Sequence, residues 1–266
     1  MPAPDVPLRL SKEPPLATVL IDRAEKRNAF TQSMWAALPE LMADVAADTS
    51  IAAVVLRGPA GGPFSAGADI SEFESLRIGE NARRYGEIVY AGVEAVASLP
   101  KATIALIQGS CIGGGCELAL ACDLRVTDTS ARLGITPAKL GLVYSLPSTA
   151  RLVDTVGPAT AKFILFTADL VDAPTALRTG LINEMQAPED VEARAYELAA
   201  HVAQRAQVSV RAAKRIVALV AAGRRDVDDE VHALYEESYE SPEYAEGVRA
   251  FLEKRAPDFA AARRQA

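Results

Sequence analysis

The amino-acid sequence predicts an α/β fold that ends in a layer of helices. Short apolar runs alternate with helix-like segments in the first half of the chain, as in folds whose strands are joined by helical crossovers. Such continuous apolar runs are typical of strands whose two faces are both covered. From about Ala159 onward the apolar runs nearly vanish, and helical segments follow one another.

Four apolar runs are predicted strands. Leu16–Ile21 is the first, and Ile51–Leu56 is the second, which ends at the glycine-proline turn that begins with Gly58. The third is Ala102–Ile107, and a short fourth strand covers Leu124–Thr127. Their separation by helical segments predicts parallel pairing through crossover connections.

The predicted helices differ in number between the two halves of the chain. Thr31–Ala47 is helical with Thr31 as its N-cap, and Asn81–Ser98 is helical and ends before Pro100. Five further helices fill the tail: Ala173–Gly180, Val191–Gln204, Ser209–Ala222, Val227–Tyr239 and Pro242–Lys254. We therefore divide the chain into an α/β core, residues 1–190, and a helical C-terminal region, residues 191–266.

The composition disfavours several classes of function. The chain has 266 residues, half of them apolar, which suits one large domain. Its net charge of −7 disfavours a nucleic-acid partner. The N-terminus lacks the apolar core of a signal peptide. The long apolar stretch 102–122 carries Gln108 and Glu117 and is a poor membrane span. We expect a cytoplasmic protein with no membrane partner.

The cysteines and histidines predict neither a disulfide framework nor a metal site. Cys111, Cys116 and Cys122 are odd in number and have no histidine near them. We expect them to be small buried side chains in a reducing compartment. His201 and His232 lie in the helical tail, outside every motif, so we expect no histidine base.

Two glycine-rich loops carry the functional signal. Gly61–Asp69 and Gly113–Glu117 each follow a strand-like run and precede a helical one. The amide groups at such a helix start attract an anion or a developing oxyanion. In neighbouring parallel strands, both loops would lie at one sheet edge, and one N–H from each could form an oxyanion hole. Glu117 would face the same space, unless it is only a first-turn acid that stabilises its helix.

Taken in order, these segments resemble the crotonase superfamily, also called the enoyl-CoA hydratase/isomerase family. The motifs that carry the resemblance are Arg23, Asn28 and Ala29, Phe64–Ile70, Gly109, Gly113–Ala119, Cys122–Leu124, Phe166 and Thr167, Ala173–Leu177, Gly180 and Leu181, and Ala250–Arg255. The resemblance covers nearly the whole chain. It implies a crotonase-like spiral of ββα units with a helical C-terminal trimerisation region, assembled as a homotrimer or a dimer of trimers.

The resemblance also implies an acyl-CoA substrate, with coenzyme A as part of the substrate and no separate cofactor. The thioester carbonyl would accept hydrogen bonds from the N–H groups of Ala68 and Gly114, which would stabilise an enolate. Further residues are implied to contact the substrate or coenzyme A: Glu25, Lys26, Arg27, Ala66, Asp69, Ile70, Pro137, Leu140, and, towards a neighbouring subunit, Phe251 and Lys254. Asp69 is also expected to brace its own loop, and the stretch from Ser71 to Tyr85 to shape the acyl pocket.

One position departs from the hydratase pattern. Hydratases of this family use two glutamates, and the first corresponds to Glu117. The second position is occupied by Pro137, whose side chain transfers no proton. Glu117 is therefore the expected main acid and base of an enoyl-CoA hydratase-like lyase.

Two alternatives follow from the same segment. Thr136–Gly141 followed by Tyr144 resembles the methylmalonyl-CoA decarboxylase branch, in which Tyr144 would lie at the acyl end. That branch has a histidine where this chain has Ala68, so a side chain that could hold a carboxylate is lost. Tyr144 could equally be a core residue. The second alternative is a non-catalytic acyl-CoA-binding protein, because Pro137 removes one acid.

Overall fold

A twisted six-stranded sheet forms the centre of the molecule. The computed structural model describes residues 6–264. The strand order is β1-β2-β3-β4-β6-β9; β1 and β2 are antiparallel and the remaining neighbours are parallel. The strands are β1 (Leu8–Glu13), β2 (Leu16–Ile21), β3 (Ala53–Arg57), β4 (Ala102–Ile107), β6 (Leu124–Asp128) and β9 (Glu184–Gln186). A second, small sheet joins β5 (Ser110–Ile112), β7 (Arg132–Gly134) and β8 (Val171–Asp172).

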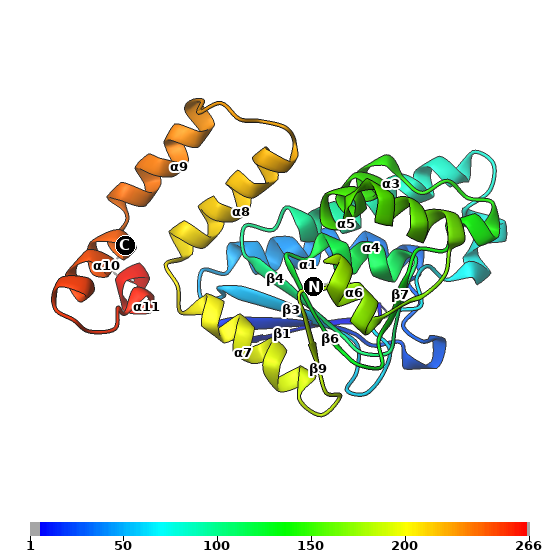
Figure 1. The fold of residues 1–266 in the computed structure, drawn as a ribbon, viewed down its shortest axis with the longest axis horizontal. Helices are drawn as coiled ribbons and strands as arrows, with labels where there is room; N and C mark the ends of the chain where they lie inside the picture. The colour runs from blue at the N-terminus through cyan, green and yellow to red at the C-terminus, as the bar shows by residue number, and fades with distance from the viewer. Residues whose placement is uncertain (1–5, 265–266) are drawn as a thin grey trace.

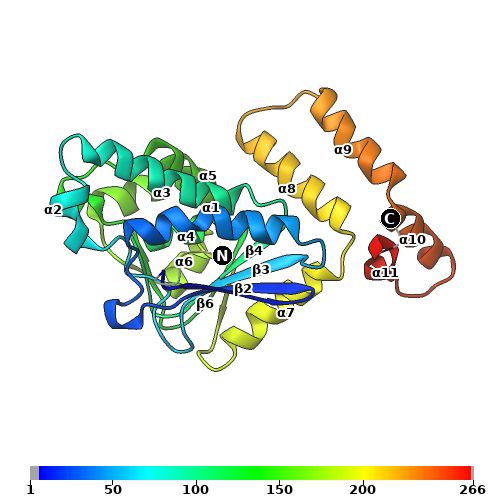
Figure 2. The ribbon, with the colours of Figure 1, turned by 180° about the vertical axis from the view of Figure 1, so that it is seen from behind.

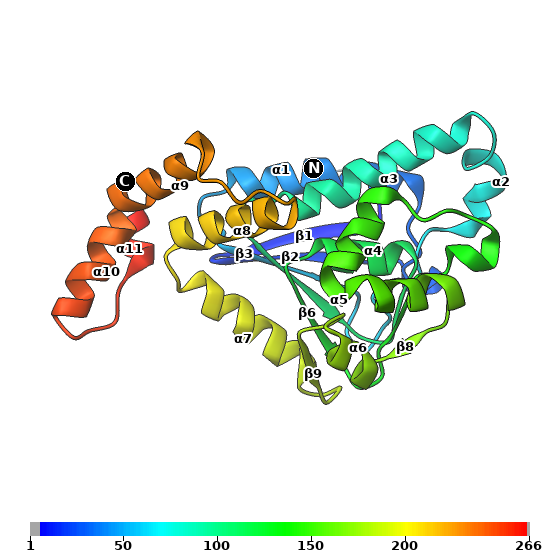
Figure 3. The ribbon, with the colours of Figure 1, turned by 45° about the horizontal axis from the view of Figure 1, so that its top comes forward.

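Helices cover both faces of the large sheet, as Figures 2 and 3 show. The helices of the body are α1 (Gln32–Ala47), α2 (Phe73–Leu76), α3 (Asn81–Ala97), α4 (Gly114–Ala121), α5 (Leu146–Thr167), α6 (Ala173–Thr179) and α7 (Val191–Ala203). Three short 3-10 helices accompany them: η1 (Ala24–Lys26), η2 (Ile70–Glu72) and η3 (Pro137–Leu140). Helices α1 and α3 lie on one face of the sheet, and α7 lies on the other.

The central strands divide their side chains between two cores. In β3, Val54 and Leu56 point into the core that contains α1, α3 and α4, whereas Val55 points into the core under α7. Helix α7 presents Val191 and Ala195, one helical turn apart, to that second core. Because both faces of β3 are buried, Ala53–Leu56 form a continuous apolar run, and the strand's one charged residue, Arg57, is paired with Glu192.

Most of the predicted elements are confirmed. Strands β2 and β4 have the predicted bounds, and α1 begins after Thr31, whose hydroxyl oxygen accepts a hydrogen bond from the N–H of Met34. Strand β3 begins two residues later than predicted, at Ala53. Strands β1 and β9 and helix α5 were not predicted. Helix α5 contains Pro147, Gly157 and Pro158, and its backbone is non-helical at Gly157, so its sequence does not have the pattern of one long helix.

The C-terminal helices extend away from the sheet (Figure 1). They are α8 (Gln207–Ala221), α9 (Asp229–Glu240), α10 (Pro242–Leu252) and α11 (Phe259–Arg264). The predicted boundary at residue 191 falls before α7, which packs on the sheet. The region that leaves the sheet therefore starts at α8.

Candidate active site

The two glycine-rich loops lie side by side at the carboxyl end of β3 and β4. These strands are parallel neighbours, with Val54 opposite Thr103 in register. Beyond them, the N–H of Phe64 donates to the carbonyl of Gln108, and the N–H of Ile112 donates to the carbonyl of Ser65. The loops are thus joined by backbone hydrogen bonds as a continuation of the sheet, as parallel pairing predicts.

Close packing between the loops depends on glycine. Gly67 has φ +98°, and a Cβ atom there would lie 2.7 Å from the carbonyl oxygen of Ile112 and 3.3 Å from the nitrogen of Gly114. A Cβ atom on Gly115 would lie 2.7 Å from the Cβ atom of Ser65. Since real Cβ contacts are longer, side chains at these positions would force the loops apart.

The backbone of Ala68 lies close to that of Gly114. A Cβ atom on Gly114 would lie 3.5 Å from the nitrogen of Ala68. The parallel bridge at Ala68 uses the N–H groups of its neighbours, because Phe30 donates to the carbonyl of Gly67 and Asp69 donates to that of Phe30. Gly114 is the first residue of α4 and has no helical acceptor. Within residues 6–264 neither the N–H of Ala68 nor that of Gly114 donates a hydrogen bond.

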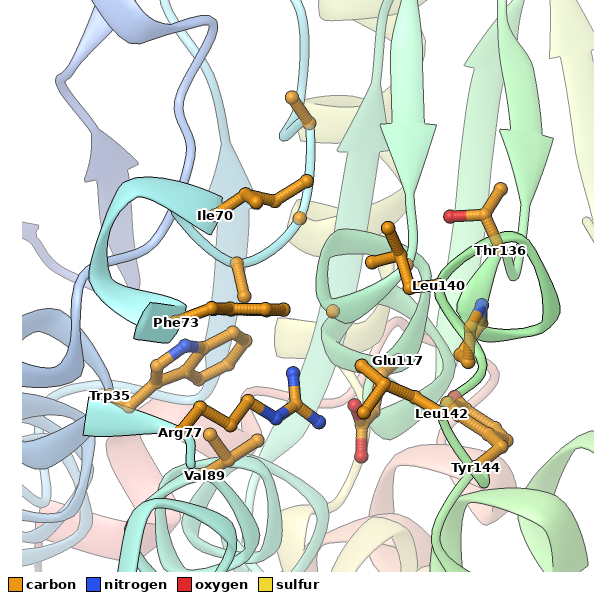
Figure 4. Close-up of a pocket in the computed structure, with 16 residues that line it drawn as sticks. Trp35, Ile70, Phe73, Arg77, Val89, Glu117, Thr136, Leu140, Leu142 and Tyr144 are labelled. Atoms are coloured by element: carbon orange, nitrogen blue, oxygen red, sulfur yellow. The ribbon is translucent and has the colours of Figure 1, made fainter. Parts of the chain in front are cut away.

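Ala68 and Gly114 both line a pocket that opens to solvent (Figure 4). Its lining residues are Trp35, Ala66, Gly67, Ala68, Ile70, Phe73, Arg77, Val89, Gly113, Gly114, Glu117, Thr136, Pro137, Leu140, Leu142 and Tyr144. The predicted residues Ala66, Ile70, Pro137 and Leu140 are therefore brought together with Glu117 and Tyr144.

Glu117 is held by a serine that the sequence analysis missed. The Ser148 hydroxyl donates a hydrogen bond to Oε1 of Glu117, and the Ser145 hydroxyl donates to Ser148 at 2.7 Å. Ser145 is the N-cap of α5, so the carboxyl group lies at the positive end of that helix. Burial raises the pKa of Glu117, while the Ser148 hydrogen bond and the charges of Arg151 and Arg77 oppose this shift. Because the raised pKa favours the protonated form, Glu117 is suited to donate a proton.

Tyr144 lies beside Glu117 in the pocket wall (Figure 4). Its hydroxyl is buried and has no hydrogen-bond partner within the described residues. Burial first, and then the charge of Glu117, raises the pKa of Tyr144 well above its usual value, so the phenol is protonated. The hydroxyl is therefore a buried donor without an acceptor among the described residues.

Pro137, which stands where the second acid is expected, lies at the pocket. Pro137 is the first residue of η3 and lines the pocket. Among the described residues of the lining, Glu117 is the one carboxylate. Thr136, the residue before Pro137, also lines the pocket and cannot serve as a base at ordinary pH.

Asp69 braces the first loop, as predicted. Its Oδ1 accepts hydrogen bonds from the N–H and hydroxyl of Ser71, and its Oδ2 pairs with Arg23 at 2.7 Å. These bonds, that with Ser71 most of all, lower the pKa of Asp69 to about 2. Asp69 is not among the lining residues, so its predicted contact with the ligand remains a prediction.

The other predicted coenzyme A contacts lie outside this pocket. Glu25, Lys26 and Arg27 are exposed around η1, near the start of the loop region. Phe251 and Lys254 lie at the end of α10, far from the pocket of the same chain (Figure 1), and Phe251 is 83% exposed. That separation is compatible with the predicted contact to a neighbouring subunit, which remains a prediction.

Two lining or supporting residues were not predicted individually. Arg77 lies in the stretch that was expected to shape the pocket, but nothing in the local pattern distinguishes it from other surface arginines. Ser148 stands three residues after Ser145 with Pro147 between them, which is a helix-start signal that could have been recognised. A search of the described residues found no cluster of metal-ligating side chains, and no helix long and apolar enough to cross a membrane.

Comparison with known proteins agrees with this arrangement. The sequence model described as "Enoyl-CoA hydratase/isomerase" matches residues 12–262. Crotonyl-CoA hydratase of Syntrophomonas wolfei is 31% identical over 254 residues, which cover 94% of this chain and 96% of that protein. Short-chain-enoyl-CoA hydratase of Clostridium acetobutylicum is 31% identical over 249 residues, covering 92% of this chain and 94% of the relative. A crystal structure titled enoyl-CoA hydratase/carnithine racemase, from Magnetospirillum magneticum, superposes with a TM-score of 0.92 at 33% identity, covering 97% and 96% of the two chains.

Proposed function

Because the chain belongs to the enoyl-CoA hydratase/isomerase family, we propose that it is an acyl-CoA lyase that hydrates an enoyl-CoA thioester. The observation that carries this proposal is the pair of free N–H groups of Ala68 and Gly114 beside Glu117 in one pocket. Two donors aimed at one oxygen stabilise the negative charge that an enolate places on a thioester carbonyl.

A single carboxyl group can carry both proton transfers of hydration. The ionised form of Glu117 takes a proton from water as the water oxygen attacks the β-carbon. The electron pair of the double bond moves onto the carbonyl oxygen, where Ala68 and Gly114 bind it. The protonated Glu117 then returns the proton to the α-carbon. Pro137 leaves no second carboxylate for either step.

Decarboxylation of a malonyl- or methylmalonyl-type CoA is the alternative reaction. The raised pKa of Glu117 and the unpaired Tyr144 hydroxyl favour it, because this reaction needs a proton donor and no base. Loss of carbon dioxide leaves its electron pair on the α-carbon, the enolate forms in the same oxyanion hole, and Glu117 supplies the proton. Both reactions therefore pass through an enolate in the same oxyanion hole, and they differ in the acyl group of the substrate.

Assays with two substrates separate these reactions. Hydration predicts that the enzyme removes the absorbance of crotonyl-CoA, and decarboxylation predicts release of carbon dioxide from methylmalonyl-CoA. Glu117→Gln should lower kcat of the active reaction by about 100- to 10,000-fold, the range of general acid–base catalysis. If this variant keeps full activity, Glu117 is not in the mechanism. Tight acyl-CoA binding without turnover of any thioester would instead identify a non-catalytic acyl-CoA-binding protein.

Self-association as a homotrimer or dimer of trimers is also proposed. Support comes from large apolar side chains that are exposed on the C-terminal helices, which is typical of surfaces that bind another protein. These side chains are Val217, Val220, Tyr239, Phe251 and Leu252. Light scattering on the purified protein tests it, because a monomeric mass would contradict both states. We further propose that coenzyme A enters only as part of the substrate and that the protein acts in the cytoplasm.

A further inference from the structure

The pocket contains one positive charge that the proposed reaction does not use. Arg77 follows α2 and lies across the pocket from Leu142 and Tyr144, with its guanidinium pointing towards Glu117 (Figure 4). Among the described lining residues it is the one cation. Within residues 6–264 its guanidinium forms no hydrogen bond and no ion pair with a carboxylate.

Aromatic rings hold the guanidinium in place. It lies 4.7 Å from the ring centre of Phe73 and 5.2 Å from that of Tyr85. Tyr85 is fully buried in α3, so this support is part of the packed core. A cation that rests on two rings is positioned before a ligand arrives, which reduces the entropy lost when an anion binds.

Glu117 does not neutralise the positive charge of Arg77. Its Oε1 is engaged by Ser148, and the charge of Arg77 is the smallest of the effects on its pKa. Burial outweighs those effects and keeps the pKa of Glu117 raised. No ion pair joins the two side chains within residues 6–264, so the guanidinium of Arg77 remains able to bind an anion, and it is best satisfied by a planar carboxylate that accepts two hydrogen bonds.

We propose that Arg77 binds a second carboxylate on the acyl group, so that the substrates are CoA thioesters of dicarboxylic acids. This inference rests on the proposed function, because it needs the thioester end of the same ligand to lie in the oxyanion hole. Ala68 has no side chain that could bind such a carboxylate, and Arg77 supplies that contact from another part of the lining. Either reaction is compatible with it, because the acyl carboxylate can be a bystander in hydration or the leaving group in decarboxylation.

The inference can be tested by the binding of saturated thioesters, because they have no double bond that the enzyme could hydrate. Titration calorimetry compares three pairs of equal chain length: malonyl- with propionyl-CoA, succinyl- with butyryl-CoA, and glutaryl- with pentanoyl-CoA. We expect the carboxylate to improve affinity by roughly 10- to 100-fold in at least one pair, as a charge-assisted hydrogen bond predicts. Arg77→Met should remove this preference while it changes affinity for the neutral partner by less than about threefold.

Two further variants control the measurement. Arg77→Lys keeps the charge but loses the planar pair of donors, so it should retain part of the preference. Arg84→Met removes an exposed arginine of α3 that does not line the pocket, and it should leave all six affinities unchanged.

The outcomes distinguish the two proposals. If the wild type binds both members of every pair equally, or if Arg77→Met weakens both equally, the dicarboxylate inference is wrong and the proposed function stands. If no thioester binds, the proposed function is wrong and the inference fails with it. If Arg77→Met still binds the dicarboxylic thioesters more tightly than their neutral partners, another group binds the carboxylate and the proposed role of Arg77 is wrong.

Discussion

The two walls of the pocket are built in different ways. One wall consists of the glycine-rich loops, and it offers backbone N–H groups of Ala68 and Gly114. The other, the side-chain wall, consists of side chains from separate elements on both sides of the pocket, among them Arg77 and, across from it, Tyr144. Backbone donors are fixed by the path of the chain, whereas side-chain groups change with a single substitution. In the proposed function, the first wall binds the oxyanion, and the second distinguishes between acyl groups and between reactions.

The largest effect should come from crowding the loop wall at Gly67. A methyl group there would meet the backbone of Ile112 and displace the N–H of Gly114. Loss of one oxyanion donor costs about 2.7–4 kcal/mol, so Gly67→Ala should lower kcat/KM by roughly 100- to 1,000-fold, measured in steady-state assays on the active thioester.

Gly61→Ala is the matched control. Gly61 belongs to the same loop and also has positive φ, at +68°, but nothing lies within 4 Å of its missing Cβ. Gly61→Ala should lower the free energy of unfolding by about 1 kcal/mol, because a non-glycine residue is strained at positive φ, and it should leave kcat/KM nearly unchanged. Equal losses of activity in both variants would show that strain, rather than crowding of the oxyanion hole, limits the first wall.

Asp69→Asn should have the next largest effect, which we expect on stability rather than on activity. The substitution removes the close carboxylate partner of Arg23 and leaves it only Glu25, at 3.8 Å among the described residues, which should lower the free energy of unfolding by about 1.5–3 kcal/mol in urea denaturation at neutral pH. The pKa of Asp69 is lowered to about 2, so its stabilisation is complete above the usual value near about 3.9 and is lost as pH falls through about 2. The difference between wild type and variant should shrink over that interval.

The same substitution at an exposed pair provides the comparison for Asp69. Asp44 pairs with Lys12 on the surface, and its side chain is 54% exposed. Asp44→Asn should change stability by less than about 1 kcal/mol. If Asp44→Asn destabilises the protein as much as Asp69→Asn does, the contacts of Asp69 with Ser71 and Arg23 contribute no more to stability than an exposed ion pair.

Ser148→Ala tests the support of Glu117 on the side-chain wall. The hydroxyl stabilises the ionised carboxylate, so its removal should raise the already raised pKa of Glu117 further. If ionised Glu117 starts the reaction, the rising limb of kcat/KM against pH moves to higher pH. If protonated Glu117 is the active form, the falling limb moves to higher pH. A profile that does not move would show that Ser148 leaves the titration of Glu117 unaffected.

Tyr144→Phe should have the smallest effect if hydration is the reaction. Its hydroxyl has no partner within the described residues, so its removal should leave the melting temperature unchanged or raised. Hydration of an enoyl-CoA should change by less than about threefold. A loss of tenfold or more on methylmalonyl-CoA would instead assign the hydroxyl to decarboxylation and move the reaction-specific group to this wall.

The sequence predicted the loop wall better than the side-chain wall. Strands β2 and β4, helix α1 with its cap, and the convergence of both loops follow from local apolar runs, cap residues and parallel pairing. Strand β1 was missed because it lies at the edge of the sheet, and its residues alternate between buried and exposed over a short, polar run. Strand β9 has only three residues and pairs only with β6, which leaves little local signal.

By itself, the sequence determined the glycine positions, the retained Glu117 and the proline at residue 137. These are local facts, because a turn with positive φ and a missing carboxylate can be read from one segment. Only the tertiary structure decided that Ser148 holds Glu117 and that the cation of Arg77 faces the same pocket without a partner. The physical reason is that these contacts join α4 to α5 and α2 across long stretches of chain, so burial, charge balance and hydrogen bonding arise only when the core has packed.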